Sequence, residues 1–268
     1  MIWAIGDIQG CYSALKELLK KIEFDLNRDK LWIAGDLINR GEDSLSTILY
    51  LYSIRDRIEV VLGNHDIALI ASYYGLKKSN SSIEPILKHP KIKDLIDWLR
   101  SQKFLHIDRE LGYCMVHAGI APSFDLGMAT MEAHTLEDSL SGNNAKEWLN
   151  TMLDDNSNRL DSQEYALSSF IRMRFCDDNQ TLDFKQKCSP DSLPKDKLNL
   201  KPWFNCHSRK DIDLKIIFGH WSTLGLYNIN NRVIGLDTGC VWGGRLTAMR
   251  IDNGSEEIVQ IDCTNNNY

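Results

Sequence analysis

Alternation between short apolar runs and helical patterns in the first third of the chain limits the possible folds more than any other feature. Residues 2–5, 30–34 and 58–62 are short apolar runs bounded by turn residues, which is typical of buried strands. The segments between them, such as residues 15–22 and 44–54, place apolar residues at the spacing of one helical face. Strand, helix and strand in succession favour parallel pairing with right-handed crossovers. The alternation therefore predicts an α/β fold.

The middle of the chain has a different character. After two helical pieces and a short strand pair, residues from about 123 to 210 are mostly polar, with helical stretches. Residues 176–202 carry three of the six prolines, which indicates long loops. Apolar runs return after residue 213, and Asn253-Gly254 is typical of a hairpin turn. We therefore predict a single domain over residues 1–268, with a mostly helical cap inserted at about 123–210.

Composition and charge exclude several classes of protein. Hydrophobic residues make up 43% of the 268 and charged residues 25%, which is ordinary for a globular protein with a sizeable core. The net charge of −6 argues against general binding to nucleic acids or anionic membranes. No apolar stretch approaches the roughly 18 residues that a membrane span requires, and the N-terminus lacks the pattern of a secretion signal. These features predict a cytoplasmic protein with no membrane partner.

The seven cysteines are scattered through the chain, and none of them belongs to a C-x-x-C pair. An odd number with this spacing is typical of neither a zinc knuckle nor a disulfide framework. We therefore expect reduced thiols, in keeping with a cytoplasmic location.

Glycine-rich polar clusters stand where the predicted strands end. They are Gly6-Asp7-Ile8-Gln9-Gly10, Gly35-Asp36-Leu37-Ile38-Asn39-Arg40-Gly41, Gly63-Asn64-His65-Asp66, His117-Ala118-Gly119 and Gly219-His220-Trp221. Taken singly, each has an ordinary explanation, because a Gly-Asp pair after a strand is commonly a turn and a lone histidine is commonly a core residue. In open α/β sheets, however, ligand sites form outside the carboxyl ends of the strands. We therefore expect the five clusters to converge on one crevice.

The side chains of these clusters predict a metal site. Carboxylate, amide and imidazole ligands suit two divalent cations of intermediate softness, such as Mn, Fe, Co or Zn. Asp36 is the expected bridge, because ions in such pairs lie about 3.5–4 Å apart and one carboxylate has to bind both. Two such ions leave the site with a net positive charge, which suits an anionic substrate. The expected ligands are Asp7 and Gln9 for one ion, and Asn64, His117 and His220 for the other.

Three consecutive motifs, GDIQG, GDLINRG and GNHD, resemble the signature of the metallo-dependent phosphoprotein phosphatase superfamily. The stretches HAGI, SFIRMRFC, KPWF, FGHW and LDTGCVWGG resemble its branch of bacterial symmetrical diadenosine tetraphosphatases, so that the match runs from Met1 to about Arg250. The resemblance implies the calcineurin-like metallophosphatase fold, with central mixed β-sheets sandwiched by helices. It also implies hydrolysis of diadenosine tetraphosphate (Ap4A) into two ADP, by in-line attack of a hydroxide held by two Mn²⁺ or Co²⁺ ions. Related dinucleoside polyphosphates and nucleotide-capped RNA 5′ ends are further substrates that it implies, and no protein partner is predicted.

The resemblance also assigns roles to individual residues. By position, Asp7, Asp36, Asn64, His117 and His220 match metal ligands, while Gln9 stands where the protein phosphatases have a histidine ligand. Arg40 would bind phosphate oxygens together with one or both of Arg172 and Arg174, and His65 would be the general acid. In the protein phosphatases an aspartate orients that histidine, but Asn39 occupies the position here. We expect the Asn39 carbonyl to accept from the imidazole while stabilising its charged form less than a carboxylate does.

Aromatic residues in the matching stretches are candidates for holding adenine by stacking. Each has the alternative of being a core residue. Lys201 is a candidate phosphate contact, with an exposed surface position as its alternative. The aromatic candidates are Trp203, Phe204, Trp221, Trp242 and the nearby Tyr227.

Two other functions remain open at this point. A protein phosphatase would have the same metal chemistry, although Asn39 and the GHW and GCVWGG stretches favour the dinucleotide branch. A non-catalytic nucleotide sensor is suggested only by Gln9. An amide oxygen binds an imidazole-preferring ion more weakly than histidine does, so we expect one firmly held ion and a looser ion near Asp7.

Overall fold

A five-stranded mixed sheet forms one half of the molecule. The computed structural model describes residues 1–153, 159–229 and 232–263. The strand order in this first sheet is β13 (Ile258–Asp262), β12 (Arg245–Arg250), β1 (Ile2–Ile5), β2 (Lys30–Ile33) and β3 (Ile58–Val60). β1, β2 and β3 are parallel, whereas β12 runs antiparallel to β1. The predicted strands of the first third and their parallel pairing are therefore confirmed.

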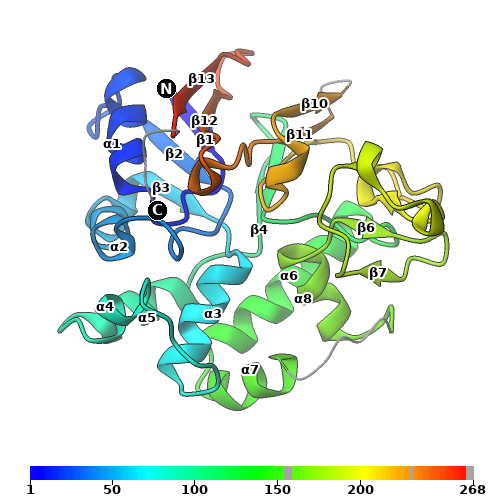
Figure 1. Cartoon of the computed structure of the whole chain (residues 1–268), viewed down its shortest axis with the longest axis horizontal. Coiled ribbons are helices and arrows are strands. Elements are labelled where there is room, and N and C mark those ends of the chain that lie inside the picture. Colours follow the sequence, from blue (N-terminus) through cyan, green and yellow to red (C-terminus); the bar gives the residue numbers. More distant parts are fainter. Residues whose placement is uncertain (154–158, 230–231, 264–268) are drawn as a thin grey trace.

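A second five-stranded sheet packs against the first (Figure 1). Its order is β10 (Tyr227–Ile229), β11 (Val233–Gly235), β9 (Lys215–Phe218), β5 (Tyr113–Val116) and β4 (Leu105–Asp108). The central pairs β11–β9 and β9–β5 are parallel, and both edge pairs are antiparallel. Buried side chains of both sheets, among them Trp32, Val61, Met115 and Ile217, form one cluster between them. The sheets are therefore held face to face by an apolar layer.

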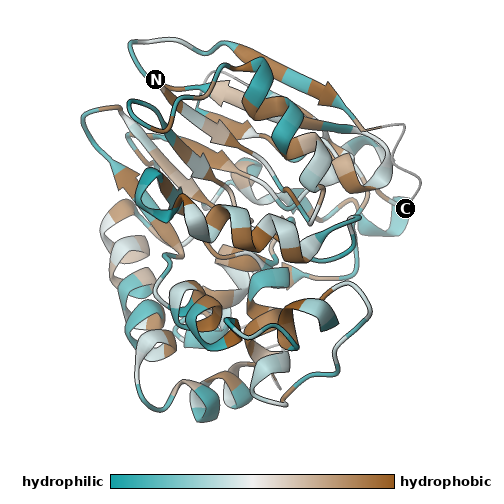
Figure 2. Ribbon diagram, turned by 90° about the vertical axis from the view of Figure 1, so that its left-hand side faces the viewer, coloured by the Kyte–Doolittle hydropathy of each residue, from teal (hydrophilic) through white to brown (hydrophobic). Residues whose placement is uncertain are grey.

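Helices follow the strands of the first half as the sequence predicts. They are α1 (Tyr12–Lys21), α2 (Ser44–Ser53), α3 (Asn64–Tyr73), α4 (Glu84–Leu87) and α5 (Ile92–Arg100). Leu15 and Leu18 on α1 are buried in the core that lies outside the first sheet. Figure 2 shows hydrophobic residues concentrated on the strands and mixed with hydrophilic residues along the helices, as amphipathic packing requires.

The segment predicted as a cap contains three helices and a small sheet. The elements are α6 (Leu126–Ser141), α7 (Ala145–Leu153), α8 (Gln163–Ile171), and the three-stranded sheet β7 (Leu182–Asp183), β6 (Phe175–Cys176) and β8 (Lys201–Pro202). Residues 154–158 of the predicted cap lie outside the described residues. Short 3-10 turns are η1 (Arg55–Arg57), η2 (Pro190–Ser192), η3 (Lys195–Lys197), η4 (Trp203–Asn205), η5 (Ser222–Leu224) and η6 (Cys240–Trp242).

Four cysteines are paired, so the expectation of reduced thiols without a disulfide framework is wrong for these positions. Cys176 pairs with Cys206, and Cys240 pairs with Cys263. The partners are 30 and 23 residues apart in sequence. They meet because β6 pairs with β8, just before Cys206, and because the β12–β13 hairpin returns the chain to η6. Spacing along the chain carries no information about either approach.

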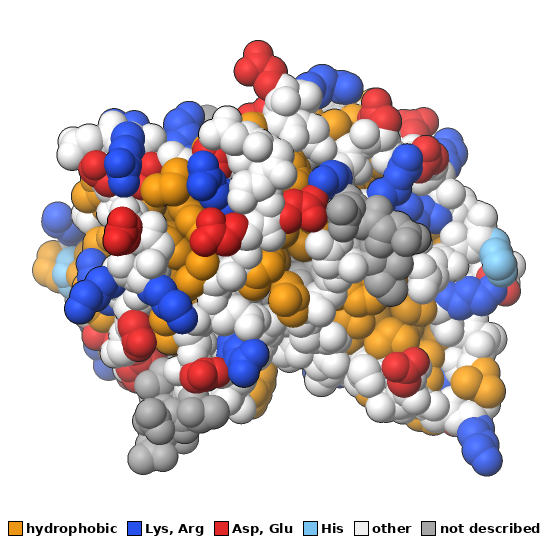
Figure 3. Space-filling view, turned by 90° about the horizontal axis from the view of Figure 1, so that it is seen from above, with side chains coloured by type: hydrophobic (Ala, Val, Ile, Leu, Met, Phe, Trp, Pro, Cys, Tyr) orange, Lys and Arg blue, Asp and Glu red, His pale blue; other side chains and the backbone are white. Residues whose placement is uncertain are grey.

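The described helices and one face of the surface bear on membrane and nucleic-acid binding as follows. In the part of the chain that the structure describes, no helix has the length and apolar character needed to cross a membrane. On the face seen from above, acidic and basic side chains are interspersed, with hydrophobic side chains between them (Figure 3).

Candidate active site

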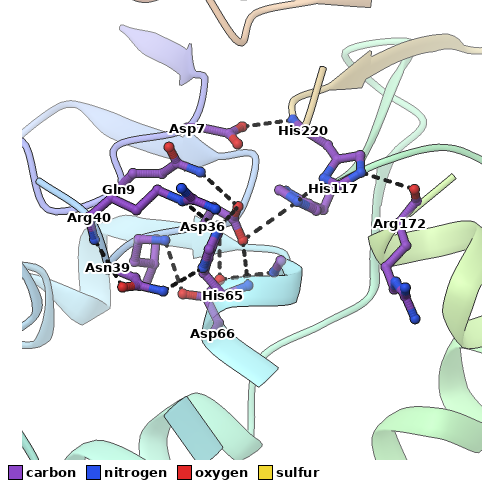
Figure 4. Close-up of polar contacts among 12 residues, drawn as sticks. Asp7, Gln9, Asp36, Asn39, Arg40, His65, Asp66, His117, Arg172 and His220 are labelled. Atoms are coloured by element: carbon purple, nitrogen blue, oxygen red, sulfur yellow. Dashed lines mark hydrogen bonds and ion pairs between the residues drawn. The ribbon is translucent and has the colours of Figure 1, made fainter. Parts of the chain in front are cut away.

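The five glycine-rich clusters meet in one place (Figure 4). Asp7 and Asp36 follow β1 and β2, which are parallel neighbours in the first sheet. His117 and His220 follow β5 and β9, which are parallel neighbours in the second sheet. The ligand atoms of Asp36, His117 and His220 all lie within 4.8 Å of one another, and all three side chains are buried. Packing the two sheets face to face thus brings carboxylates from one sheet to imidazoles from the other.

The two buried histidines present unprotonated nitrogens to each other. His117 Nδ1 donates to the Ala34 carbonyl oxygen at 2.7 Å, and His220 Nε2 donates to the Arg172 carbonyl oxygen at 3.0 Å. Because a neutral imidazole carries one proton, His117 Nε2 and His220 Nδ1 both have free lone pairs, and they lie 3.2 Å apart. Burial lowers the pKa of both rings and keeps them neutral. Two lone pairs facing each other at this distance fit a cation held between them.

The Asp36 carboxylate is placed as a bridge between two halves of the site. Its Oδ1 lies 3.6 Å from His117 Nε2 and also accepts from the His65 backbone N–H at 2.8 Å. Its Oδ2 faces the other way and accepts from Gln9 Nε2 at 3.1 Å. Gly63 leaves room for this group, since a Cβ there would lie 2.2 Å from Asp36 Oδ1. Each of the two oxygens can therefore bind a different metal ion, one on either side of the carboxylate.

Asp7 has a buried oxygen without a partner. Its Oδ1 accepts from the His220 backbone N–H at 2.9 Å, while Oδ2 has no hydrogen-bond partner among the described residues. Burial raises the pKa of Asp7 well above its ordinary value, and the neighbouring carboxylates of Asp237 and Asp36 raise it further. A cation bound at Oδ2 would remove this penalty. The residues present therefore fit a divalent metal ion on the Asp7 side of Asp36 as well.

Two predicted amide ligands point into the same region. One end of the Asn64 amide lies 3.0 Å from His220 Nδ1 and 3.3 Å from the Ile171 carbonyl oxygen. In the absence of a metal the NH₂ group suits these two acceptors, whereas a cation there would attract the oxygen. Gln9 lines the cavity and donates its NH₂ group to Asp36. Both residues are thus within reach of the proposed ions, and their role as ligands remains a prediction.

Asp66 is a buried acid to which the sequence analysis assigns no role. Its carboxylate accepts three backbone N–H groups, from Asp36 at 2.8 Å, Leu37 at 3.0 Å and Gly63 at 2.9 Å. These bonds tie the turn after β2 to the start of α3, which begins at Asn64. Asn64 and His65 therefore stand in the first turn of a helix. The available signal was an acid at the third position of a helix that follows a glycine.

The site is held in a strained backbone conformation. Five residues that line or adjoin it have positive φ angles, and glycine is the residue that adopts such angles without penalty. The two turns support each other, since Gln9 N–H donates to the Asp36 carbonyl oxygen and Gly41 N–H donates to the Gln9 carbonyl oxygen, each at 2.8 Å. Strain of this kind concentrates at functional sites. The five angles are +47° for Gln9, +48° for Asp36, +82° for Asn39, +76° for Arg40 and +66° for His220.

Asn39 contacts His65 in the opposite sense to the one expected. Asn39 Oδ1 accepts from the Arg40 backbone N–H at 3.0 Å and from Asn80 Nδ2 at 3.1 Å. The NH₂ end is therefore the one that lies 2.7 Å from His65 Nδ1, and it donates to that nitrogen. The expectation that the carbonyl accepts from the imidazole is wrong, because the oxygen already has two N–H donors.

This contact determines which nitrogen of His65 carries the proton. The ring cannot accept on both nitrogens, and Arg40 Nε lies 3.3 Å from Nε2, farther away than Asn39 lies from Nδ1. We assign the proton to Nε2 because the shorter bond is the stronger one. Burial lowers the pKa of His65, the Asp36 carboxylate opposes this shift, and Arg40 and Lys77 add to it.

A cavity of about 940 Å³ opens beside the metal ligands. Its lining includes Gln9, Asp36, Asn64, His65 and His220. Five cationic side chains also line it, and they include all three arginines predicted to bind phosphate: Arg40, Arg172, Arg174, Lys77 and Lys187. Arg174 additionally donates to the His220 carbonyl oxygen at 2.8 Å. The two lysines were not singled out by sequence, because a surface lysine has no distinguishing pattern.

Five other predicted substrate contacts, Trp203, Phe204, Trp221, Tyr227 and Lys201, are not in the cavity lining. Trp203 and Trp221 are buried in the core, and the Trp221 indole N–H donates to the Cys188 carbonyl oxygen. Tyr227 packs on Phe204, with ring centroids 4.8 Å apart. Lys201 pairs with Asp178 at 2.7 Å. The structure therefore lends no support to stacking or phosphate binding by these residues.

Comparison with known proteins agrees with this architecture. The family model described as calcineurin-like phosphoesterase matches residues 1–221. A symmetrical bis(5′-nucleosyl)-tetraphosphatase of Cellvibrio japonicus is 46% identical, covering 97% of this chain and 98% of that protein. The protein with the same name in Pseudomonas entomophila is 42% identical, covering 98% and 94%.

Solved structures share the fold at lower identity. One, described as a candidate diadenosine tetraphosphatase, has a TM-score of 0.66 at 23% identity and covers 98% of this chain and 94% of its own. A cold-active protein-tyrosine phosphatase of a Shewanella species has a TM-score of 0.57 at 17% identity, covering 98% and 78%. At these identities the structures show the fold alone. From the family match, the curated relatives and the site geometry together, we conclude that the chain belongs to the calcineurin-like phosphoesterase family.

Proposed function

We propose that this protein is a metal-dependent hydrolase that cleaves Ap4A symmetrically into two ADP. The observation that carries the proposal is a cluster of side chains suited to metal binding, beside a cavity that five cationic side chains line. A polyphosphate bridge carries negative charge on every phosphate, so it complements such a lining. The name shared by the full-length relatives at 39–46% identity supports the same substrate.

The residues that would hold two divalent cations are divided by Asp36. Gln9 contacts its Oδ2 and would hold one ion together with Asp7, while His117 lies near its Oδ1 and would hold the other ion together with Asn64 and His220. When bound, such ions supply an activated water near neutral pH and neutralise charge on the attacked phosphoryl group. Mn²⁺ and Co²⁺ suit this mixture of carboxylate, amide and imidazole ligands.

The remaining residues would orient the substrate and its leaving group. Arg40, Arg172 and Arg174 present forked donors that match phosphate oxygens. His65, with its proton on Nε2, would donate a hydrogen bond to the oxygen of the departing ADP. ADP is a good leaving group, so a neutral imidazole is sufficient there, whereas a serine alkoxide needs a stronger acid.

Related dinucleoside polyphosphates and nucleotide-capped RNA 5′ ends carry the same type of phosphate bridge, and we propose them as additional substrates. We place the activity in the cytoplasm, where nucleotides are made and consumed. Cell fractionation followed by immunoblotting checks this location.

Hydrolysis of Ap4A with added Mn²⁺ or Co²⁺, followed by chromatography of the products, tests the proposal. ADP as the sole product is expected. AMP together with ATP would exclude symmetrical cleavage, and absence of any hydrolysis would reject the substrate. A phosphoserine peptide assayed in parallel separates this function from that of a protein phosphatase, which would release phosphate from the peptide at the higher rate.

A further inference from the structure

An exposed tryptophan lines the cavity without a structural reason for its exposure. Trp242 is 64% exposed on η6, although large aromatic side chains are normally largely buried. The Arg40 guanidinium lies over its ring, 4.9 Å from the centroid. A base stacked on this ring would therefore adjoin an arginine that is proposed to bind phosphate.

The turn that carries Trp242 is rigid. Gly239 and Gly243, with φ of +73° and +79°, flank the 3-10 turn. Backbone bonds close the turn, from the Trp242 N–H to the Gly239 carbonyl oxygen at 2.9 Å and from the Gly243 N–H to the Cys240 carbonyl oxygen at 3.0 Å. The Cys240–Cys263 disulfide attaches it to the end of β13. The indole is thus held outward by its backbone, which is the arrangement expected of a preorganised binding surface.

A second pair of the same kind comes from the cap segment. Phe184 follows β7, is half-buried and lines the same cavity. The Arg172 guanidinium lies over its ring, 4.7 Å from the centroid. Arg40 and Arg172 lie on opposite flanks of the metal-ligand group (Figure 4). Each flank of the site therefore has one aromatic ring with one arginine over it.

We propose that Trp242 and Phe184 are the two nucleobase platforms of this cavity, one for each end of a substrate that carries a base at both ends. The proposal rests on the proposed function and extends it to specificity. Each ring would stack on one adenine while its arginine contacts the adjoining phosphates. With a base held on each flank, the central P–O–P bond lies at the metal ligands, and its hydrolysis by water gives two ADP. The two platforms therefore set the symmetrical position of cleavage.

Kinetics and product analysis of the metal-loaded protein test the proposal. We expect Trp242→Ala and Phe184→Leu each to lower kcat/KM for Ap4A by about 5- to 100-fold, mainly through KM, which is the range that stacking of one base provides. We also expect AMP and ATP to appear among the products of each variant. Trp242→Phe, which keeps an aromatic face, should restore most of the wild-type KM. Tyr73→Ala, which removes a 38% exposed aromatic outside the cavity lining, is the matched control and should behave as wild type.

A fluorescence titration with ADP separates this proposal from the proposed function. ADP should quench tryptophan emission of the wild-type protein, and the quenching should be lost in Trp242→Phe. Thermal melts confirm that each variant is folded. Unchanged KM and ADP as sole product in both platform variants would overturn the proposal, even if the wild type hydrolyses Ap4A. A wild type that shows Trp242-dependent quenching without hydrolysing Ap4A would reject the proposed reaction and leave the platform at Trp242 in place.

Discussion

Replacing Asn39 by aspartate should raise the pKa of the His65 imidazole. In the structure the Asn39 NH₂ group donates to His65 Nδ1 at 2.7 Å, so protonation of that nitrogen would set two donors against each other. An aspartate keeps the acceptor for the Arg40 and Asn80 N–H groups and presents a second oxygen to the ring. That oxygen accepts from Nδ1–H and favours the imidazolium form.

The size of the effect follows from the geometry. A carboxylate in hydrogen-bond contact with an imidazole raises its pKa by about 1–2 units, from a starting point that burial now holds below the ordinary value. Each unit corresponds to about 1.4 kcal/mol, so the imidazolium is stabilised by about 1.4–3 kcal/mol. His65 would then supply a stronger acid near neutral pH. Substrates with poor leaving groups should benefit most, because their reaction depends on protonation of the departing oxygen.

NMR titration of the His65 ring and parallel assays measure this change. We expect the His65 pKa to rise in Asn39→Asp, and hydrolysis of an alkyl phosphate monoester to rise about 10-fold, while the rate with Ap4A changes little. Asn39→Ala removes the contact without adding charge and is the control, for which no gain with the monoester is expected. A His65 pKa in Asn39→Asp at or below the wild-type value would refute the assignment of donor and acceptor in this pair.

Four further predictions concern the same site and the stability of the fold. Gln9→His should retain more metal after dialysis against a chelator than the wild type, which we expect to keep one ion firmly. Mass spectrometry counts the metal ions that each protein retains, and two tightly held ions in the wild type would contradict the prediction. Asp66→Asn should lower the free energy of unfolding by about 2–3 kcal/mol in urea, because an amide cannot accept all three backbone N–H groups; an unchanged midpoint would count against this role. Burial lowers the pKa of His106 to about 4 from 6.5, so below pH 6.5 the unfolded chain binds a proton that the folded protein does not. Wild-type stability should therefore fall by about 3 kcal/mol more than that of His106→Gln between pH 7 and pH 4, and parallel slopes would disprove it. His65→Ala should lower kcat for Ap4A less than Arg40→Ala does, and steady-state kinetics showing the reverse order would remove the case for a minor role of the proton donor.

Much of the scaffold was predictable because it depends on local patterns. Runs such as residues 2–5 and 58–62 are apolar enough to be buried on both faces, and the helical segments between them leave parallel pairing as the simple arrangement. The polar clusters at the strand ends were predictable for the same reason. A glycine-rich turn after a buried strand places the next polar side chain at the sheet edge, and parallel strands share that edge.

Contacts between distant segments were beyond such reasoning. On sequence grounds Trp203, Trp221 and Trp242 are equal candidates for holding adenine, yet Trp203 and Trp221 are core residues and Trp242 is exposed in the cavity. An indole gives the same signal in all three cases, because burial depends on what packs over it. The direction of the Asn39 amide depends likewise on Asn80, a residue 41 positions away.

The sequence by itself determined the strands of the first third and their parallel pairing, the glycine-rich turns and the types of side chain that those turns carry. These follow from apolar periodicity and from backbone sterics, which act over a few residues. Only the tertiary structure decided that the unprotonated ring nitrogens of His117 and His220 face each other 3.2 Å apart, that Asp66 accepts three backbone N–H groups, and that four cysteines form two disulfides. Each of these contacts requires two sheets, or two loops distant in sequence, to come close together. How they come together is set by the packing of the whole core.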